Sequence, residues 1–258
     1  MPSSRLIVIT GGGGGIGRAT AMLCARRGDY VAILDKGGAE AAAAAALAAG
    51  AAGAAGISCD VTDETQVQRA FASIHEQFGA PWGIFANAGI DVGGMIHEMP
   101  IEKWKHIVDT NLTGIFLTCK HGLRQMLAAK TAGSIVCTSS PAGFVAMAAG
   151  SCGAYSATKG AISSLVRCMA IDYAKFGIRV NAVAPGATET GLMWNNVASG
   201  EIDAMRAQLG REIPLGRLAD SEEPARVVAW LLSDETTYMT GSHVVCDGGI
   251  LAKSSISL

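Results

Sequence analysis

Short runs of β-branched residues alternate along the chain with longer amphipathic stretches. The runs predict seven strands, over Arg5–Thr10, Tyr30–Asp35, Ala54–Cys59, Trp82–Asn87, Ser134–Ser139, Ile178–Ala184 and His243–Cys246. The stretches predict helices over residues 15–28, 39–49, 63–79, 101–130, 153–176 and 221–233. Strands separated by helices of this length need crossover connections, which favours a parallel sheet of about seven strands with helices on both faces. We therefore expect one doubly wound α/β domain over residues 1–258, without a linker or an internal repeat.

Two segments interrupt this regular pattern. Residues 39–56 consist almost entirely of Ala and Gly, which would suit either a linker or a helix. Because Ala is the best helix former and the alternation requires a helix here, we predict a helix. Residues 186–217 lack a clear period and contain several glycines, so we expect an irregular lid over residues 187–216.

Composition narrows the class of protein. The net charge of −2 gives no electrostatic argument for binding nucleic acid or an anionic membrane. The unbroken apolar stretches are too short for a membrane span. Seven scattered cysteines without a CxxC pair are typical of a reducing compartment, so we expect a cytoplasmic protein. The five histidines show no metal-ligand spacing, and we expect no metal.

A glycine-rich run connects the first predicted strand to the first predicted helix. In this context backbone N–H groups can approach a pyrophosphate at the positive end of a helix. Asp35 ends the second predicted strand, where a carboxylate can accept hydrogen bonds from a ribose 2′-hydroxyl, although it could also be a turn residue. Its charge would repel a 2′-phosphate, which favours NAD over NADP, while Arg18 and Lys36 could soften that repulsion. The Rossmann-type cofactor residues predicted in this region are Gly11, Gly14, Gly15, Ile16, Gly17 and Asp35.

Tyr155 and Lys159 are four residues apart at the start of a predicted helix, so they share one helix face. A free phenol has a pKa near 10 and is a poor base at neutral pH. Two unit charges about 4 Å apart gain roughly 4 kcal/mol at an effective dielectric near 20, but only about 1 kcal/mol in water. Lys159 would thus activate Tyr155 only in a site partly closed to solvent. Tyr–Lys pairs with this spacing also occur by chance in many helices. The glycine run and Asp35 in the same chain favour a functional role for this pair.

Taken in order, these motifs resemble those of the short-chain dehydrogenase/reductase family over nearly the whole chain. Thr10–Gly17 resembles the TGxxxGIG motif, and residues 86–89 the NNAG motif, with Ala86 in place of the first Asn. The resemblance implies that Asp60 and Val61 hold the adenine ring, that Asn87 belongs to the cofactor site, and that Thr188 and Thr190, after Pro185-Gly186, lie on the nicotinamide side. Pro214–Arg217, Thr240-Gly241 and Asp247–Gly249 resemble the family's C-terminal stretch.

The same resemblance implies the catalytic roles. Tyr155 would be the acid/base, Lys159 would lower its pKa and bind the nicotinamide ribose, and Asn111 would shape a proton-relay water. The family's serine commonly lies 13 residues before the tyrosine, where this chain has Ala142. The resemblance of the local Ser-Ser-x-Ala-Gly run to the family's motif instead selects Ser140 over Ser139 and implies a two-residue insertion within residues 144–153. Strand alternation turns the two serines to opposite faces, so only one of them should lie in the cleft.

The expected substrate is a neutral, hydrophobic secondary alcohol or ketone, including cyclic ones. Charged side chains that could bind a phosphate or carboxylate handle are not clustered near the expected pocket. Several of its residues could equally pack the lid against the body. The predicted substrate residues are Ser140, Ala142, Met147, Tyr155, Met193 and Trp194, with Pro141, Val145 and Cys152 nearby.

Other functions fit parts of the pattern. One is a 3-oxoacyl-thioester reductase using NADPH, against which Asp35 and the apolar Phe176 argue, although Lys130 and Lys175 would suit a basic docking patch. Another is a non-catalytic NAD-binding regulatory protein, which would not need the catalytic residues. A lyase or dehalogenase on this fold would be expected to lack the glycine loop. The resemblance also implies a homotetramer or homodimer, formed through the helices that contain Asn111 and Tyr155 and through the C-terminal tail.

Overall fold

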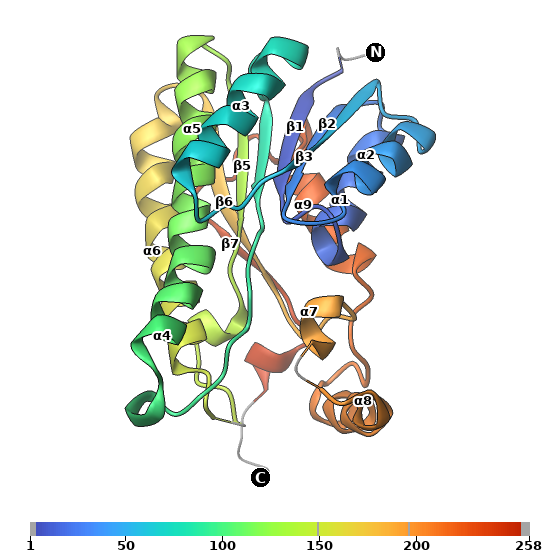
Figure 1. Cartoon of the computed structure of the whole chain (residues 1–258), viewed down its shortest axis with the longest axis vertical. Coiled ribbons are helices and arrows are strands. Elements are labelled where there is room, and N and C mark those ends of the chain that lie inside the picture. Colours follow the sequence, from blue (N-terminus) through green and yellow to red (C-terminus); the bar gives the residue numbers. More distant parts are fainter. Residues whose placement is uncertain (1–3, 149, 196, 254–258) are drawn as a thin grey trace.

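The computed structural model describes residues 4–148, 150–195 and 197–253, which form a seven-stranded, fully parallel sheet (Figure 1). The strand order is β3-β2-β1-β4-β5-β6-β7. The predicted doubly wound domain is confirmed, with each strand within about two residues of its expected bounds. The strands are β1 (Leu6–Thr10), β2 (Tyr30–Asp35), β3 (Gly53–Ser58), β4 (Gly83–Ala86), β5 (Gly133–Thr138), β6 (Ile178–Pro185) and β7 (His243–Cys246).

Helices cover both faces of the sheet, as the crossover argument requires (Figure 1). One face carries α1 (Gly15–Arg26), α2 (Ala39–Ala48) and α9 (Glu222–Leu231). The other carries α3 (Glu64–Phe78), α4 (Ile101–Val108), α5 (Gly114–Ala128) and α6 (Gly153–Ala174). None of the helices in the described part of the chain combines the length and apolarity that a bilayer crossing demands.

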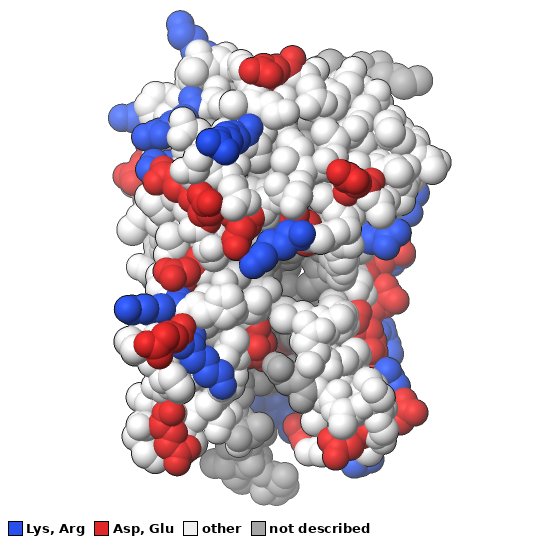
Figure 2. All heavy atoms as spheres, in the orientation of Figure 1, with Lys and Arg blue, Asp and Glu red and all other residues white. Residues whose placement is uncertain are grey.

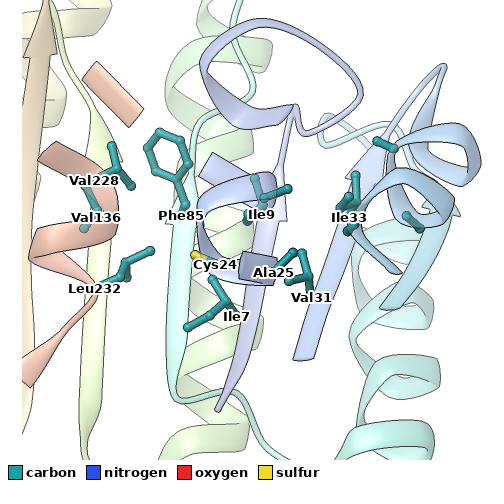
Figure 3. Packing of buried hydrophobic residues seen from close by; sticks show 14 of the residues in the cluster. Ile7, Ile9, Cys24, Ala25, Val31, Ile33, Phe85, Val136, Val228 and Leu232 are labelled. Atoms are coloured by element: carbon teal, nitrogen blue, oxygen red, sulfur yellow. The ribbon is translucent and has the colours of Figure 1, made fainter. Parts of the chain in front are cut away.

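The core beneath α1 and α2 is built from aliphatic and small side chains. Figure 3 shows the aliphatic side chains of β1 and β2 facing α1, with Phe85 and Val136 continuing the layer toward α9. Ala42 and Ala46 of α2 are buried in the same cluster. A Cβ at Gly56 of β3 would lie 2.3 Å from the carbonyl oxygen of Ala39, so only glycine allows α2 this close to the sheet. The Ala/Gly segment is therefore a packed helix and strand, not a linker.

Two elements differ from the sequence prediction. The helix expected over residues 101–130 contains a π-helical turn at Asp109–Thr113, between α4 and α5. The lid expected to be irregular contains a short α7 (Gly191–Trp194) and an 11-residue α8 (Ile202–Glu212). None of the residues of α8 is buried, so it lacks the apolar stripe by which an amphipathic helix is recognised.

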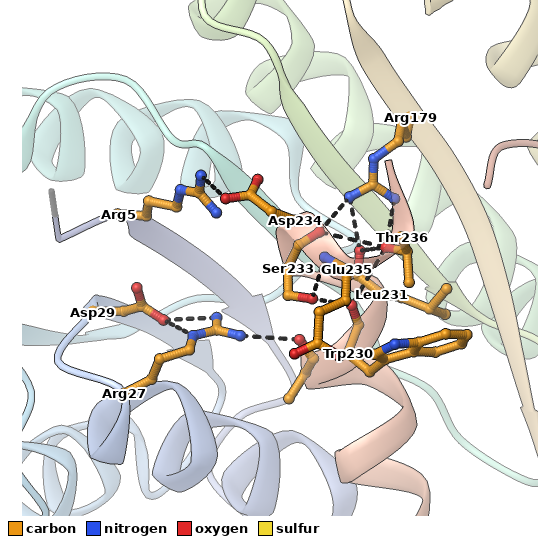
Figure 4. Close-up of polar contacts among 11 residues, drawn as sticks. Arg5, Arg27, Asp29, Arg179, Trp230, Leu231, Ser233, Asp234, Glu235 and Thr236 are labelled. Carbon is orange, nitrogen blue, oxygen red and sulfur yellow. Dashed lines mark hydrogen bonds and ion pairs between the residues drawn. The ribbon is translucent and has the colours of Figure 1, made fainter. Parts of the chain in front are cut away.

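Polar contacts close the amino-terminal edge of the sheet (Figure 4). Arg5 pairs with Asp234 at 2.7 Å, and Arg27 pairs with Asp29 at 2.6 Å. The Arg179 guanidinium donates to the carbonyl oxygens of Leu231 and Ser233. The contacts of Arg5 and Arg179 connect the loop after α9 to the starts of β1 and β6. The cleft described below lies at the opposite edge of the sheet.

Candidate active site

A cleft of about 440 Å³ lies at the carboxyl ends of β1, β4, β5 and β6. The strand order reverses between β1 and β4, and such switch points are where open α/β sheets bind ligands. In the orientation of Figure 1, Figure 2 shows a hollow in the middle of the molecular surface, with charged side chains of both signs scattered around it. The predicted site residues among its lining are Gly11, Gly14, Gly15, Ile16, Asp35, Asn87, Tyr155, Lys159, Thr188, Thr190 and Met193.

The glycine loop brings backbone close to the floor of this cleft. A Cβ at Gly17 would lie 2.2 Å from the carbonyl oxygen of Gly11, so glycine is required where α1 crosses the loop. The N-cap residue Gly14 supplies no side-chain cap, and the first turn of α1, wholly within the described residues, carries no acidic group. The N-terminal N–H groups and the positive end of the helix dipole suit a dinucleotide pyrophosphate.

Asp35 is held rigidly at the edge of the cleft. Its Oδ2 accepts a hydrogen bond from the Gly13 N–H and its Oδ1 accepts one from the Gly37 N–H, both at 2.9 Å. Lys36, which could have softened repulsion of a phosphate, instead pairs with Asp60 at 3.0 Å. The carboxylate of Asp35 therefore dominates this end of the cleft. Asp60 and the buried Val61 lie outside the cleft lining.

Asn87 joins three of the elements that form the cleft. Its Nδ2 donates to the carbonyl oxygens of Thr10 and Gly11, and its Oδ1 accepts a hydrogen bond of 3.0 Å from Thr138 Oγ1. The loops after β1, β4 and β5 are thereby fixed relative to one another.

The two candidate serines at the end of β5 have different partners. Ser140 is hydrogen-bonded to the side chain of Tyr155, and its Oγ accepts a bond from the Ala142 N–H at 3.2 Å. Ser139 Oγ instead lies 3.3 Å from the carbonyl oxygen of Lys159 and 3.3 Å from Ser163 Oγ. The structure thus places the Ser140 side chain beside the phenol, whereas the serine in the lining of the cleft is Ser139.

Lys159 lies one helical turn after Tyr155 and is almost fully buried, at 2% exposure. Its Nζ donates to the carbonyl oxygen of Thr138 at 2.9 Å and lies 5.5 Å from the centre of the Tyr155 ring. Gly143 allows this packing, because a Cβ there would lie 2.9 Å from the backbone of Lys159. The helix and the loop after β5 are therefore in close contact around the ammonium group.

The electrostatics of the protein alone differ from the expected activation. Burial raises the pKa of Tyr155 to about 12; the hydrogen bond with Ser140 lowers it, and the charge of Asp91 raises it further. Burial lowers the pKa of Lys159 to about 8, against the opposing effects of Cys137 and Asp91. In the protein alone, desolvation is thus the largest cause of both shifts, and it disfavours the charged form of each group.

Asn111 is fully buried in the π-helical turn and lies behind the cleft. Its Oδ1 accepts from the Ile90 N–H at 2.8 Å, and its Nδ2 donates to the Ile90 carbonyl oxygen at 2.9 Å. Its side chain therefore fixes the loop after β4 in place.

The lid side of the cleft is held by Glu189. This residue lies between Thr188 and Thr190, and its carboxylate accepts bonds from Arg206 Nε at 2.6 Å and from Trp194 Nε1 at 2.9 Å. Trp194 thus ties α7 to α8 instead of lining the cleft. Thr190 caps α7 by accepting a hydrogen bond from the Met193 N–H, and Met193 faces the cleft.

A second hollow of about 450 Å³ lies beside the first. It contains two predicted substrate residues, Ala142 and Met147, together with Val145 and Cys152. Of the six predicted substrate residues, Tyr155 and Met193 line the main cleft, Ala142 and Met147 line this second hollow, and Ser140 and Trp194 line neither.

Thr138 and Asp91 are among the contributors to the cleft that were not predicted from the sequence. Thr138 acts through its backbone carbonyl, which residue type does not reveal. Asp91 lines the cleft two residues after the motif at residues 86–89. An acidic residue in a loop is common, and only its position after that motif could have singled it out.

Comparison with known proteins agrees with this geometry. A family model described as enoyl-(acyl carrier protein) reductase matches residues 12–251. The chain is 39% identical to a cis-4-hydroxycyclohexanecarboxylate dehydrogenase of Sinomonas cyclohexanicum, covering 97% of this chain and 98% of that protein. It is 38% identical to a 2,5-dichloro-2,5-cyclohexadiene-1,4-diol dehydrogenase of Sphingobium indicum, with the same coverage. The crystal structure of a short-chain type dehydrogenase/reductase from Mycobacterium marinum superposes with a TM-score of 0.91 at 32% identity, covering 97% of both chains.

The fold, the cleft and these similarities define an oxidoreductase that uses a nicotinamide cofactor to interconvert alcohols and carbonyl compounds. The chain belongs to the short-chain dehydrogenase/reductase family. Membership argues against the regulatory, lyase and dehalogenase alternatives.

Proposed function

We propose that the protein oxidises a small, neutral secondary alcohol to a ketone with NAD, and catalyses the reverse reaction with NADH. The observation that carries this proposal is that Tyr155 and Lys159 line the same cleft as the glycine loop and Asp35, with Ser140 in contact with the phenol of Tyr155.

Each catalytic residue has a role that its position supports. Ser140 holds the alcohol oxygen, and Tyr155 accepts the proton of that hydroxyl as the carbonyl forms. The nicotinamide cofactor supplies the hydride acceptor and, in its oxidised form, a positive charge that favours the phenolate. Lys159 would add its own positive charge and would hold the nicotinamide ribose by a hydrogen bond. Asn111 fixes the loop after β4 and belongs to the proton-relay path.

Asp35 supports NAD as the cofactor. A carboxylate held by two backbone N–H groups can accept hydrogen bonds from a ribose 2′-hydroxyl and repels a 2′-phosphate. Lys36, one of the two cations that could offset this repulsion, is paired with Asp60.

Apolar side chains around the cleft support a neutral organic substrate. Large exposed hydrophobic residues occur in the loops after β4 and β5 and in the lid, including Met95, Ile96, Val145, Met147 and Leu192. Two relatives carry names that specify alcohols on a six-membered ring: one names a cyclohexadiene diol, and the other a hydroxycyclohexanecarboxylate, which bears a charged carboxylate besides the alcohol. A six-membered cyclic alcohol is the substrate class we infer.

The assembly and location complete the proposal. We infer a cytoplasmic homotetramer or homodimer. Phe116 of α5 and Ile171 of α6 are exposed apolar residues on the helices expected to meet a second subunit. The C-terminal tail after Lys253, also expected to contribute, lies outside the described residues.

The second candidate is a 3-oxoacyl-thioester reductase using NADPH, toward which the description of the matched acyl-carrier family model points. A panel separates the two: cyclohexanol and cyclohexanediols with NAD or NADP, and a 3-oxoacyl thioester with NADH or NADPH. The proposal predicts the highest kcat/KM with a cyclic alcohol and NAD. Preferential turnover of the thioester with NADPH would establish the alternative instead.

A further inference from the structure

The loop after β4 presents its backbone and side chains to the cleft in a fixed position. Asn111 binds both the N–H and the carbonyl oxygen of Ile90. Farther along, the Gly94 N–H donates to the Ser151 carbonyl oxygen at 2.7 Å, and Lys103 Nζ donates to the Gly93 carbonyl oxygen at 2.7 Å. Asp91 lies between these anchors, so its backbone is held from both sides.

Asp91 shares the cleft with the catalytic residues. It lines the same space as Tyr155 and Lys159, and its negative charge raises the pKa of both. Burial in turn raises the pKa of Asp91, while Lys159 lowers it. Because the three side chains line one cleft, a molecule bound at the phenol shares that space with this carboxylate.

The two acidic residues lining the cleft serve different parts of it. Asp35 lies at the end of β2, against the glycine loop, where the adenosine ribose of a dinucleotide belongs. Asp91 lies on the loop beside Tyr155, together with the apolar Leu192 and Met193 across the cleft. A substrate whose reacting oxygen contacts Tyr155 in this cleft is therefore bound in a space that contains both apolar side chains and a carboxylate.

This arrangement discriminates among substituents on that ring. A second hydroxyl can donate a charge-assisted hydrogen bond to a carboxylate, which has about four acceptor positions, so the bond from the Val92 N–H does not preclude it. A carboxylate substituent would instead meet charge repulsion at short range. A ring without a second polar group would gain neither effect.

We propose that Asp91 is a specificity residue that selects cyclic diols by accepting a hydrogen bond from the non-reacting hydroxyl and disfavours cyclic hydroxycarboxylates. This inference rests on the proposed alcohol dehydrogenase activity and adds the class of substituent that the site selects.

The test compares kcat/KM ratios for three substrates: cyclohexanol, 1,4-cyclohexanediol and 4-hydroxycyclohexanecarboxylate. Ratios to cyclohexanol cancel any effect of Asp91 on the chemical step. Asp91→Ala should lower the diol ratio about tenfold, the loss expected for one hydrogen bond to a charged group. Asp91→Asn keeps the size of the side chain and should raise the hydroxycarboxylate ratio about tenfold. Glu98→Gln, which removes an exposed carboxylate outside the cleft, should leave both ratios unchanged.

A binding measurement separates this inference from the proposed activity. Calorimetry with NAD present measures the Kd of 1,4-cyclohexanediol for Tyr155→Phe and for the double variant Tyr155→Phe/Asp91→Ala, in which turnover does not interfere. About tenfold weaker binding to the double variant supports the role of Asp91. Equal Kd values, or diol ratios that Asp91→Ala leaves unchanged, would overturn it. A wild-type protein that oxidises none of the three alcohols would instead overturn the proposed activity.

Discussion

Lys159 donates a hydrogen bond of 2.9 Å from Nζ to the backbone carbonyl oxygen of Thr138. This bond joins α6 to the end of β5 and fixes an ammonium group in a buried position beside the phenol of Tyr155. Burying a charge without an ionic partner lowers the stability of the folded protein. The buried ammonium group of Lys159 therefore costs stability while it places a positive charge beside Tyr155.

The cost of burying Lys159 should appear as a pH-dependent stability. Its pKa is about 8 in the folded protein, against an ordinary value of 10.5. Between these values the unfolded chain binds more protons at this group, so its contribution to stability rises with pH through that window. Relative to Lys159→Met, the wild-type free energy of unfolding should increase by about 3 kcal/mol between pH 8 and pH 10.5.

Urea denaturation of both proteins at several pH values measures this difference. Taking the difference cancels the titration of all other groups that the two proteins share. A difference that stays constant from pH 8 to pH 10.5 would show that the lysine titrates normally in the folded state.

The two neighbouring serines offer a matched pair of variants. Ser140 contacts Tyr155, whereas Ser139 contacts the Lys159 carbonyl oxygen and Ser163. Ser140→Ala removes a donor to the reacting oxygen and should reduce kcat about 100-fold. Ser139→Ala should cost far less, since its hydroxyl bonds α6. Steady-state kinetics of alcohol oxidation decide the matter, and equal losses in the two variants would show that the assignment to Ser140 is wrong.

Asp35 should control the choice of cofactor. Asp35→Ser removes the charge that repels a 2′-phosphate, and the ratio of kcat/KM with NADP to that with NAD should rise at least about tenfold. Glu40→Gln removes a nearby exposed charge from the first turn of α2 and serves as the control. An unchanged ratio in Asp35→Ser would mean that this carboxylate does not contact the ribose.

Glu189 should hold the lid against the body of the protein. Its bonds to Arg206 and Trp194 join the loop after β6 to both lid helices. Since the Glu189–Arg206 pair is partly exposed, Glu189→Gln should cost about 1 kcal/mol of local stability. Amide hydrogen exchange in α8 should then be about fivefold faster, whereas Arg211→Met on the same helix should not change it. Equal exchange rates in Glu189→Gln and the wild type would show that Glu189 does not hold the lid in place.

The sequence predicted the sheet because most of the strands are short apolar runs, such as Leu6–Thr10 and Tyr30–Asp35, and this local pattern can be recognised without knowledge of tertiary contacts. It also singled out Tyr155 and Lys159, whose four-residue spacing is local. Helix α8 was not predicted from the sequence because it buries none of its residues. Its position depends on Glu189, which lies 17 residues before its contact residue Arg206.

Contacts between residues that are distant in the sequence could not be predicted either. The Thr138 carbonyl contacts Lys159 across 21 residues. The approach of Asp91 to the catalytic pair depends on Asn111, which anchors the loop through the backbone of Ile90. The high pKa of Tyr155 follows from burial, a quantity that spacing alone does not specify.

The most direct test of the catalytic assignment is the rate of NADH formation from cyclohexanol and NAD by wild-type protein and by Tyr155→Phe, with NAD binding measured in parallel. The substitution removes the exchangeable proton and keeps the ring. We predict that kcat falls at least about 1000-fold while NAD still binds, because proton transfer is lost and the cofactor cleft is intact. Turnover by Tyr155→Phe near the wild-type rate would contradict the assignment of Tyr155 as the acid/base.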